Sequence, residues 1–261
     1  MTGITTSGKV AGSRVAPVRR IRDVLRTRIL AGVYGTRPLP SEAELAADFQ
    51  ASRNVVRDVL TLLRMEGLVD RIPGVGTFVV AGKAVHGLDR LRGLAESFGT
   101  GPDRVVNQVL LADTVLATPA VAERLQLDAG TEVVALERVR LLDGEPLSLD
   151  ASYLPADVGR PLLEMDLTSN DVFVLIEQEL GLPLGAAELS IEAIAADRTV
   201  ADLLRVHDGF PLLFIERLTY TDAGRPIDLE FVRFRGDRMS LAGWLHRTPD
   251  PLLNHSSPER G

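Results

Sequence analysis

A row of polar side chains in the first third of the chain has the residue types that read DNA bases. Arg53, Asn54, Arg57 and Thr61 recur at helical spacing, so they share one face of a helix opposite its apolar residues. An arginine guanidinium pairs bidentately with guanine, and an asparagine amide pairs with adenine. Because Arg53 and Asn54 stand at its beginning, this helix is predicted to enter the major groove by its N-terminal end.

Two further helices are predicted to position this row. An amphipathic pattern predicts a first helix that ends at about residue 31. Ser41 and Glu44 form the S-x-x-E capping box that starts a second helix, and Ser52 is a plausible N-cap for the third. Backbone amides at these two helix N-termini can hold phosphates. The three helices therefore form a helix-turn-helix unit.

A hairpin is predicted directly after the third helix. The runs LVDRI and TFVV alternate as strands around Pro73, Gly74, Val75 and Gly76. The two glycines remove side-chain bulk from the tip, so its backbone can approach a duplex closely. Helices followed by such a hairpin predict a winged helix-turn-helix over residues 16–80.

Charge is distributed unevenly along the chain. Of 29 basic and 36 acidic residues, 13 and 7 fall in residues 1–83, which leaves 16 and 29 for the remainder. The net charge is therefore about +6 in the first third and −13 beyond it, although the whole chain has −7. Phosphates feel the local field within about 8–10 Å, so an acidic protein can still carry a nucleic-acid module.

Composition excludes several other classes of protein. The chain has no cysteine and four dispersed histidines, so no metal site, disulfide framework or cofactor is expected. No apolar run approaches the roughly 20 residues of a membrane span, and no signal peptide is seen. We expect a cytoplasmic protein without a membrane partner, and its 261 residues predict two domains.

The stretch LPSEAELAADFQASRNVVRDVLTLLRMEGLVDRIPGVGTFV closely resembles the DNA-binding domain of GntR-family bacterial regulators. The resemblance implies double-stranded operator DNA as the partner. Together with the cap and wing analysis above, it defines a set of candidate DNA-contact residues. These are Ser41, Ser52, Arg53, Asn54, Val55, Arg57, Arg71, Gly74, Gly76 and Thr77.

The acidic part contains an internal repeat. Residues 122–154 align with residues 201–234, in step for 21 positions and then offset by one at Ala223. Arg138 pairs with Arg217, and Asp150 pairs with Glu230. Each copy is predicted to form a short helix, a turn, a strand, a hairpin turn and a second strand. Two copies indicate a duplicated unit in one antiparallel sheet with a pseudo-two-fold axis.

Residues from about 90 to 245 resemble the ligand-sensing UTRA domain, which has a chorismate-lyase-like fold and marks the HutC subfamily of GntR regulators. The resemblance is carried by LERVRLLDGEPLSLDASYLP, EAIAADRTVADLLRV and FRGDR. Between the repeats, SNDVFVLIEQELGLPL is predicted to be helical and GAAELSIEAIAA to be a strand. The expected fold class is α+β, an antiparallel sheet with flanking helices.

By the family precedent, a small-molecule effector lies in a cleft of this sheet. Arginines two residues apart share one strand face and offer planar forks to an anion, while carboxylates accept hydrogen bonds. A structural ion pair explains each residue equally well. The matching positions are Arg92, Arg138, Arg140, Asp150, Ser152, Tyr153, Asp228 and Glu230.

The effector itself stays open. Relatives that sense sugar phosphates have hydroxyl-rich residues after the linker, whereas RLRGLAESFG at 90–99 has one hydroxyl, at Ser97. Backbone amides near Arg92 and Gly93 remain an alternative anion site. The acidic candidates suit an amine or a polyol equally well.

The predicted organisation has five parts. A disordered tail (1–15) precedes the winged helix-turn-helix (16–80), and a linker (81–90) joins it to the effector domain (91–248) and a second disordered tail (249–261). Within the linker, His86 is interpreted as surface and Lys83 as a candidate phosphate contact. The expected function is a ligand-responsive, homodimeric regulator, usually a repressor, on a palindromic operator. The alternatives are an enzyme on a chorismate-lyase-like fold and a protein-binding winged-helix adaptor.

Overall fold

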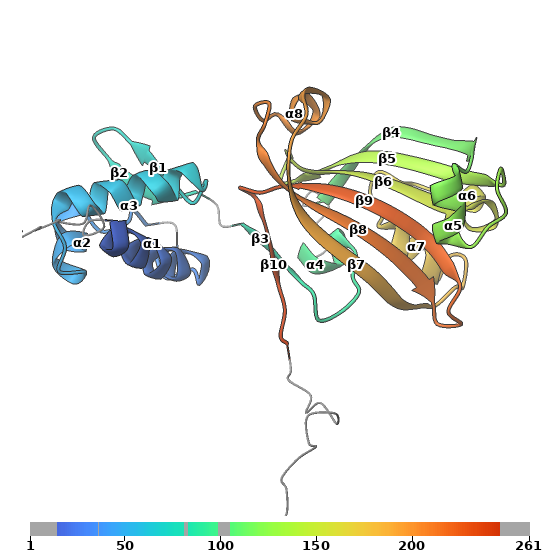
Figure 1. The fold of residues 1–261 in the computed structure, drawn as a ribbon, viewed down its shortest axis with the longest axis horizontal. Coiled ribbons are helices and arrows are strands. Elements are labelled where there is room, and N and C mark those ends of the chain that lie inside the picture. The colour runs from blue at the N-terminus through green and yellow to red at the C-terminus, as the bar shows by residue number, and fades with distance from the viewer. Residues whose placement is uncertain (1–14, 36, 81–82, 99–104, 246–261) are drawn as a thin grey trace, which may run out of the picture.

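The computed structural model has two domains joined through residues 83–98 (Figure 1). It describes residues 15–35, 37–80, 83–98 and 105–245. The two predicted disordered tails lie outside these ranges, apart from Val15, at which the first helix begins. None of the helices within the described ranges is long and apolar enough to span a membrane.

The N-terminal domain is the predicted winged helix-turn-helix. Its three helices pack around a core that includes Leu25, Val59 and Leu63, all fully buried. The wing strands pair antiparallel, with Arg71 opposite Thr77. The elements are α1 (Val15–Leu30), α2 (Glu42–Asp48), α3 (Arg53–Met65), β1 (Val69–Ile72) and β2 (Gly76–Val79).

Local hydrogen bonds set where the second and third helices begin. The Ser41 hydroxyl accepts from the Glu44 amide, and the Glu44 carboxylate accepts from the Ser41 amide, so the predicted capping box is confirmed. The Ser52 hydroxyl caps α3 by accepting from the amide of Val55 at 3.3 Å. These caps fix the turn that presents α3.

The C-terminal domain is built on one six-stranded antiparallel sheet in the order β4-β5-β6-β9-β8-β7. The predicted α+β class is confirmed. The strands are β4 (Val105–Leu116), β5 (Glu132–Leu142), β6 (Glu145–Pro155), β7 (Leu184–Ala195), β8 (Pro211–Thr221) and β9 (Pro226–Arg235). The helices are α4 (Leu94–Phe98), α5 (Pro119–Leu125), α6 (Ala156–Leu163), α7 (Val172–Gln178) and α8 (Arg198–Leu204).

The internal repeat forms the middle of this sheet. Helices α5 and α8 are equivalent, and both end at a residue in the left-handed conformation, Gln126 and Arg205. Each helix leads into a hairpin, β5-β6 or β8-β9, and the two hairpins meet where β6 pairs with β9. The pseudo-two-fold axis therefore runs between β6 and β9, as the repeat predicts.

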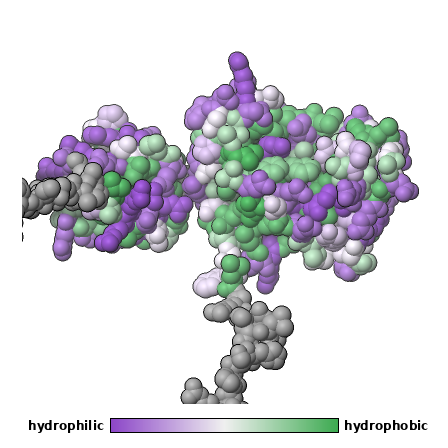
Figure 2. Space-filling model, in the orientation of Figure 1, coloured by the Kyte–Doolittle hydropathy of each residue, from purple (hydrophilic) through white to green (hydrophobic). Residues whose placement is uncertain are grey.

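Helices cover both faces of the sheet. Helices α5 and α8 pack on one face, where Val133, Val139 and Leu149 are buried. Helices α4, α6 and α7 pack on the other face, against residues such as Leu136 and Phe234. In the view of Figure 2, the N-terminal domain is mostly hydrophilic, whereas hydrophobic surface is spread over the strands of the sheet domain.

A two-stranded ribbon lies between the domains. Strand β3 (Ala84–Gly87) falls within the predicted linker and pairs in parallel with β10 (Met239–Ala242), near the end of the described chain (Figure 1). The half-buried Lys83 ammonium, the predicted phosphate contact, donates to the carbonyl of Gly236 at 2.6 Å. Gly67 of the N-terminal domain lies directly against Asp237.

Candidate DNA-contact surface and effector pocket

The exposed face of α3 carries the predicted base-reading residues. Arg53, Asn54 and Arg57 are all exposed. The Arg57 guanidinium is held by Glu42, with 2.7 Å between Nε and Oε2. Arg53 has no ion pair among the described residues, so its five donors face solvent. The beginning of α3 can therefore present an arginine and an asparagine to the edges of bases.

Val55, also a predicted DNA contact, does not present its side chain on this face. The side chain is 8% exposed and packs in the core of the domain with Val56 and Val59. Its backbone amide donates to Ser52. The hydroxyls of Ser41 and Ser52 are likewise engaged in helix capping, although both residues remain exposed.

The wing exposes the remaining candidates. Arg71 is exposed and Thr77 is half-buried. Gly74 has a φ of +78° and Gly76 a φ of +148°, conformations that residues with a Cβ rarely adopt. A Cβ on Gly74 would meet nothing within 4 Å, so the wing tip is open to an approaching surface.

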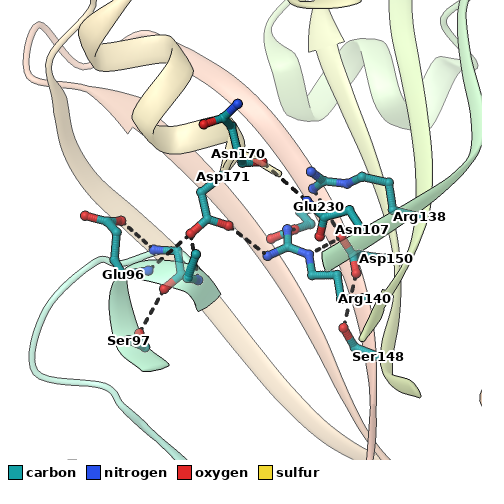
Figure 3. A network of polar contacts seen from close by, with 12 residues as sticks. Glu96, Ser97, Asn107, Arg138, Arg140, Ser148, Asp150, Asn170, Asp171 and Glu230 are labelled. Carbon is teal, nitrogen blue, oxygen red and sulfur yellow. Dashed lines mark hydrogen bonds and ion pairs between the residues drawn. The ribbon is translucent and has the colours of Figure 1, made fainter. Parts of the chain in front are cut away.

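Charged residues are buried on the α4, α6 and α7 face of the sheet (Figure 3). Arg138 and Arg140 on β5 both bind Asp150 on β6, at 3.2 Å from Nη2 and 2.7 Å from Nε. Ser148 donates to the other oxygen of this carboxylate at 3.2 Å. The predicted pair of arginines on one strand face is thus held by a carboxylate of the protein itself, although Nε and Nη1 of Arg138 are buried without hydrogen-bond partners among the described residues.

The same network continues across the pseudo-two-fold axis. Arg217 on β8 ion-pairs with Glu230 on β9, directly opposite, as Arg138 does with Asp150. Arg140 also contacts Glu230 at 3.2 Å and Asp171 at 3.4 Å. The guanidinium carbon of Arg217 lies 4.6 Å from the ring centre of Phe173 on α7. The two ion pairs are therefore equivalent parts of the repeat.

Burial and mutual charge shape the protonation of this network. Burial lowers the pKa of Arg138, and the charge of Arg140 lowers it further. Burial acts in the same direction on Arg140, but the carboxylates around it outweigh burial and raise its pKa. Burial raises the pKa of Asp228 to about 7, and the negative charge of Glu230 contributes to this rise. Asp228 is therefore the carboxyl group that takes a proton most readily.

A pocket of about 240 Å³ opens at one end of this network. Its walls come from the chain after β3, from the start of β7, and from β8 and β9. A mostly apolar pocket with a few convergent polar groups is the usual form of a small-molecule site. The lining includes His86, Leu88, Arg90, Leu91, Leu94, Ala187, Leu189, Ile215, Arg217, Val232 and Phe234.

The structure brings most of the predicted effector residues to this end of the sheet. Those that line the pocket are Arg92, Arg140 and Glu230. Those buried on the same face without lining it are Arg138, Asp150, Ser152 and Asp228. The latter group supports the pocket floor and does not reach its open space.

Tyr153, also a predicted effector contact, does not face this pocket, because it lies on the opposite face of β6. Side chains alternate along a strand, so Tyr153 points away from the face of Ser152. It packs in the cluster under α5, where its ring stands edge-on to that of Phe231 with 6.3 Å between centroids. Tyr153 therefore cannot contact a molecule in this pocket.

Sequence reasoning missed several residues of the site. His86, interpreted as linker surface, is 9% exposed, and it lines the pocket with an unpaired Nδ1. Burial lowers its pKa, as do the nearby guanidiniums of Arg217 and Arg140. Arg217 could have been identified from the sequence, since it is the repeat equivalent of Arg138. The sequence pattern does not identify Asp171, because it lies outside both repeat copies.

No group of three or more metal-binding side chains is present among the described residues. The alternative anion site at the backbone amides near Arg92 and Gly93 is already filled. The Gly93 amide donates to Glu96 at 2.8 Å, and the Ala95 amide donates to Asp171 at 2.8 Å. These amides have carboxylate partners from the protein itself.

Comparison with known proteins matches two separate parts of the chain. Residues 17–79 match the model of bacterial regulatory proteins of the gntR family, and residues 102–240 match the UTRA domain. The HTH-type transcriptional regulator Rv0792c of Mycobacterium tuberculosis is 32% identical over 216 residues, which cover 80% of this chain and 78% of that protein. The HTH-type transcriptional repressor NagR of Bacillus subtilis is 29% identical over 229 residues, covering 87% and 94%.

A solved structure extends the likeness to the whole fold. PhnF from Mycobacterium smegmatis superposes with a TM-score of 0.63 at 26% identity, covering 87% of this chain and all of that one. A winged helix-turn-helix joined to a ligand-sensing sheet domain defines the class, a transcription regulator and not an enzyme. The chain belongs to the GntR family of bacterial regulatory proteins and carries a UTRA domain.

Proposed function

We propose that this chain, as a HutC-type regulator in the cytoplasm, represses transcription by binding a palindromic operator as a homodimer. A small-molecule effector in the pocket lowers its affinity for that operator. One observation carries the proposal: the pocket wall contains the residues that follow β3, the strand that leads from the DNA-binding domain. The names of relatives agree with repression, since NagR and a fructoselysine utilization operon regulator of Escherichia coli are both named repressors.

The affinity for DNA comes from the local charge of the N-terminal domain. Residues 1–83 carry a net charge of about +6 within a chain of −7. Phosphate contacts position the domain, while Arg53 and Asn54 select bases. Two such domains related by a two-fold axis require half-sites about one helical turn, or a multiple of it, apart.

Coupling between pocket and operator passes through the linker. His86 lies on β3 itself, and Arg90, Arg92 and Leu94 follow within eight residues of it. A ligand that packs against these residues favours one position of the β3–β10 ribbon. A binding difference of about 1–3 kcal/mol between two arrangements of the heads changes operator affinity about 5–150-fold.

The test of DNA recognition uses two arginines of the same helix. Arg53→Ala removes a base-reading side chain, whereas Arg64→Ala removes an exposed cation at the far end of α3. Fluorescence anisotropy with an operator selected from random DNA should show Arg53→Ala weakening binding by about 1–3 kcal/mol. Arg64→Ala should change it by less than about 0.5 kcal/mol. Equal affinity of wild type and Arg53→Ala for this operator would favour the protein-binding adaptor instead.

The test of the pocket uses two alanines of the same strand. Ala187 lines the pocket, and Ala193 lies on the same face of β7 but outside the pocket and is exposed. Cell metabolites are screened for release of wild-type protein from the operator. Ala187→Phe should abolish release by the active metabolite and Ala193→Phe should keep it. Release that survives Ala187→Phe would place the effector elsewhere.

A further inference from the structure

Asp171 lies between helix α4 and Arg140 of the buried ion network (Figure 3). It is the N-cap residue of α7, but its side chain makes no capping hydrogen bond to that helix. The carboxylate is 3% exposed and reaches across to α4, where it accepts from the amides of Ala95 at 2.8 Å and Glu96 at 3.3 Å. Its other oxygen faces Arg140 at 3.4 Å.

Two backbone amides and a guanidinium around one oxyanion are the groups that proteins use to hold a phosphate or carboxylate of a ligand. Here the protein supplies that oxyanion. The fit is close, because a Cβ on Gly93 would lie 2.3 Å from the nearer Asp171 oxygen. No space remains at this point for a second oxyanion beside the carboxylate.

The charges of the network are also balanced without a ligand. Three buried or nearly buried arginines (138, 140 and 217) face three carboxylates, those of Asp150, Asp171 and Glu230. A phosphate brought to Arg140 would stand beside Asp171, and two anions that share one site disfavour each other. Displacing Asp171 would leave a buried charge without partners, which is costlier still.

We propose that Asp171 is a specificity-determining residue: it takes the place of a ligand's anionic group at Arg140, so the effector presents a neutral hydrogen-bonding group there. The proposal deepens the proposed function and rests on it for the identity of the pocket. Replacing Asp171 turns the position into a phosphate site.

Away from Arg140 the pocket wall is mostly apolar, and the exposed residues Arg90 and Arg92 also line it. His86 Nδ1 and Arg217 Nε are buried without hydrogen-bond partners among the described residues, and both residues line the pocket. Beside them the wall is aliphatic and aromatic, with Leu94, Ile215 and Phe234. A hydroxyl, carbonyl or amide group can hydrogen-bond to the polar side chains of this lining while the remainder of the molecule packs on this wall.

The experiment is a calorimetric titration of the full-length protein with inorganic phosphate at constant ionic strength. Wild type is compared with Asp171→Ala, Asp171→Asn and the control Asp197→Asn. Asp197 is also an N-cap residue, but it caps its own helix α8 through its side chain and lies outside the pocket. Folding of every variant is checked by circular dichroism.

Asp171→Ala should show saturable phosphate binding at least about tenfold tighter than the detection limit of the wild-type titration, because one like charge is removed at contact distance. Wild type and Asp197→Asn should give no saturable heat, and adding Arg140→Gln to Asp171→Ala should abolish the new binding. Should Asp171→Ala fail to fold, Asp171→Asn keeps the shape, loses the charge and should show the gain. Saturable phosphate binding by wild type that Arg140→Gln abolishes, or folded Asp171 variants without any gain, would overturn the proposal.

These outcomes are independent of the operator. The titration contains no DNA, so a failed proposal about Asp171 appears in the phosphate heats alone. Failure of the proposed function appears instead as metabolite release that is insensitive to Ala187→Phe.

Discussion

Asp150 is the carboxylate on which the buried network depends most, and its replacement by asparagine tests that account. The side chain is 1% exposed and accepts from Arg138, Arg140 and Ser148. An asparagine amide at this position would keep the shape but remove the charge that compensates two buried guanidiniums. We expect Asp150→Asn to destabilise the sheet domain strongly without changing the surface.

The magnitude follows from the burial of the partners. Removing one partner of a buried ion pair costs about 3–5 kcal/mol, because the remaining charge is left in a poorly solvated place. A matched pair exists at the surface, where Arg225 binds Asp157 through two hydrogen bonds of 2.7 Å. Both partners are about half exposed, so Asp157→Asn should cost at most about 1 kcal/mol.

The assay is thermal unfolding of the full-length protein followed by calorimetry, with the transition of the sheet domain assigned by comparison with wild type. At about 2–4 °C per kcal/mol, Asp150→Asn should lower this transition by about 6–20 °C. Asp157→Asn should lower it by at most about 4 °C. Equal shifts for the two variants would refute the claim that burial of the ion network decides its contribution to stability.

Three other perturbations follow from the structure. Burial raises the pKa of Asp228 from 3.8 to about 7, so between these values the folded state holds a proton that the unfolded state releases. The free energy of unfolding, measured by urea titration relative to Asp228→Asn, should therefore fall between about pH 4 and 7 and level off above that range. Gly67→Ala adds a Cβ 2.8 Å from that of Asp237 at a φ of +70°, which should lower the free energy of unfolding by at least about 1 kcal/mol in thermal unfolding. The double variant with Asp237→Gly should recover the part of this loss that is due to the clash, and not the part that is due to the backbone conformation. Glu42→Gln releases Arg57 from its ion pair at 2.7 Å and removes a negative charge near the duplex. In anisotropy titrations, operator affinity should therefore rise severalfold at low salt and converge with that of wild type at high salt. A lower affinity would contradict the placement of Arg57.

The parts of the fold that local pattern dictates could be predicted from the sequence. The capping box at Ser41 and the cap at Ser52 define two helix beginnings through bonds within three residues, and both are confirmed. The repeat predicted the two central hairpins, because each is closed by its own turn. The repeat also relates Arg138 to Arg217, and both form ion pairs in the structure.

The remaining features depend on contacts that no local pattern records. Strand β3 is four residues long, and its partner β10 begins 155 positions after it along the chain, so the linker has no period of its own. His86 is buried because of this pairing. Asp171 is the third residue of the stretch predicted to be helical and the N-cap of the observed helix α7, and only tertiary packing directs its side chain at α4.

Two predicted contacts have side chains on the packed face of their element. Tyr153 neighbours Ser152 on β6, so the two side chains point to opposite faces of the sheet. The side chain of Val55 packs with Val56 and Val59 on the buried side of α3. In both cases strand or helix periodicity alone assigns the side chain to the packed face.

The most direct test of the central claim is the affinity of the full-length chain for DNA selected from a random pool, measured by fluorescence anisotropy against a scrambled sequence across a salt series. We expect enrichment of a palindrome, selective binding to it, and a logarithm of affinity that falls linearly with the logarithm of salt. We also expect that the selectivity disappears in Arg53→Ala. Equal affinity for selected and scrambled DNA at every salt concentration would contradict the claim.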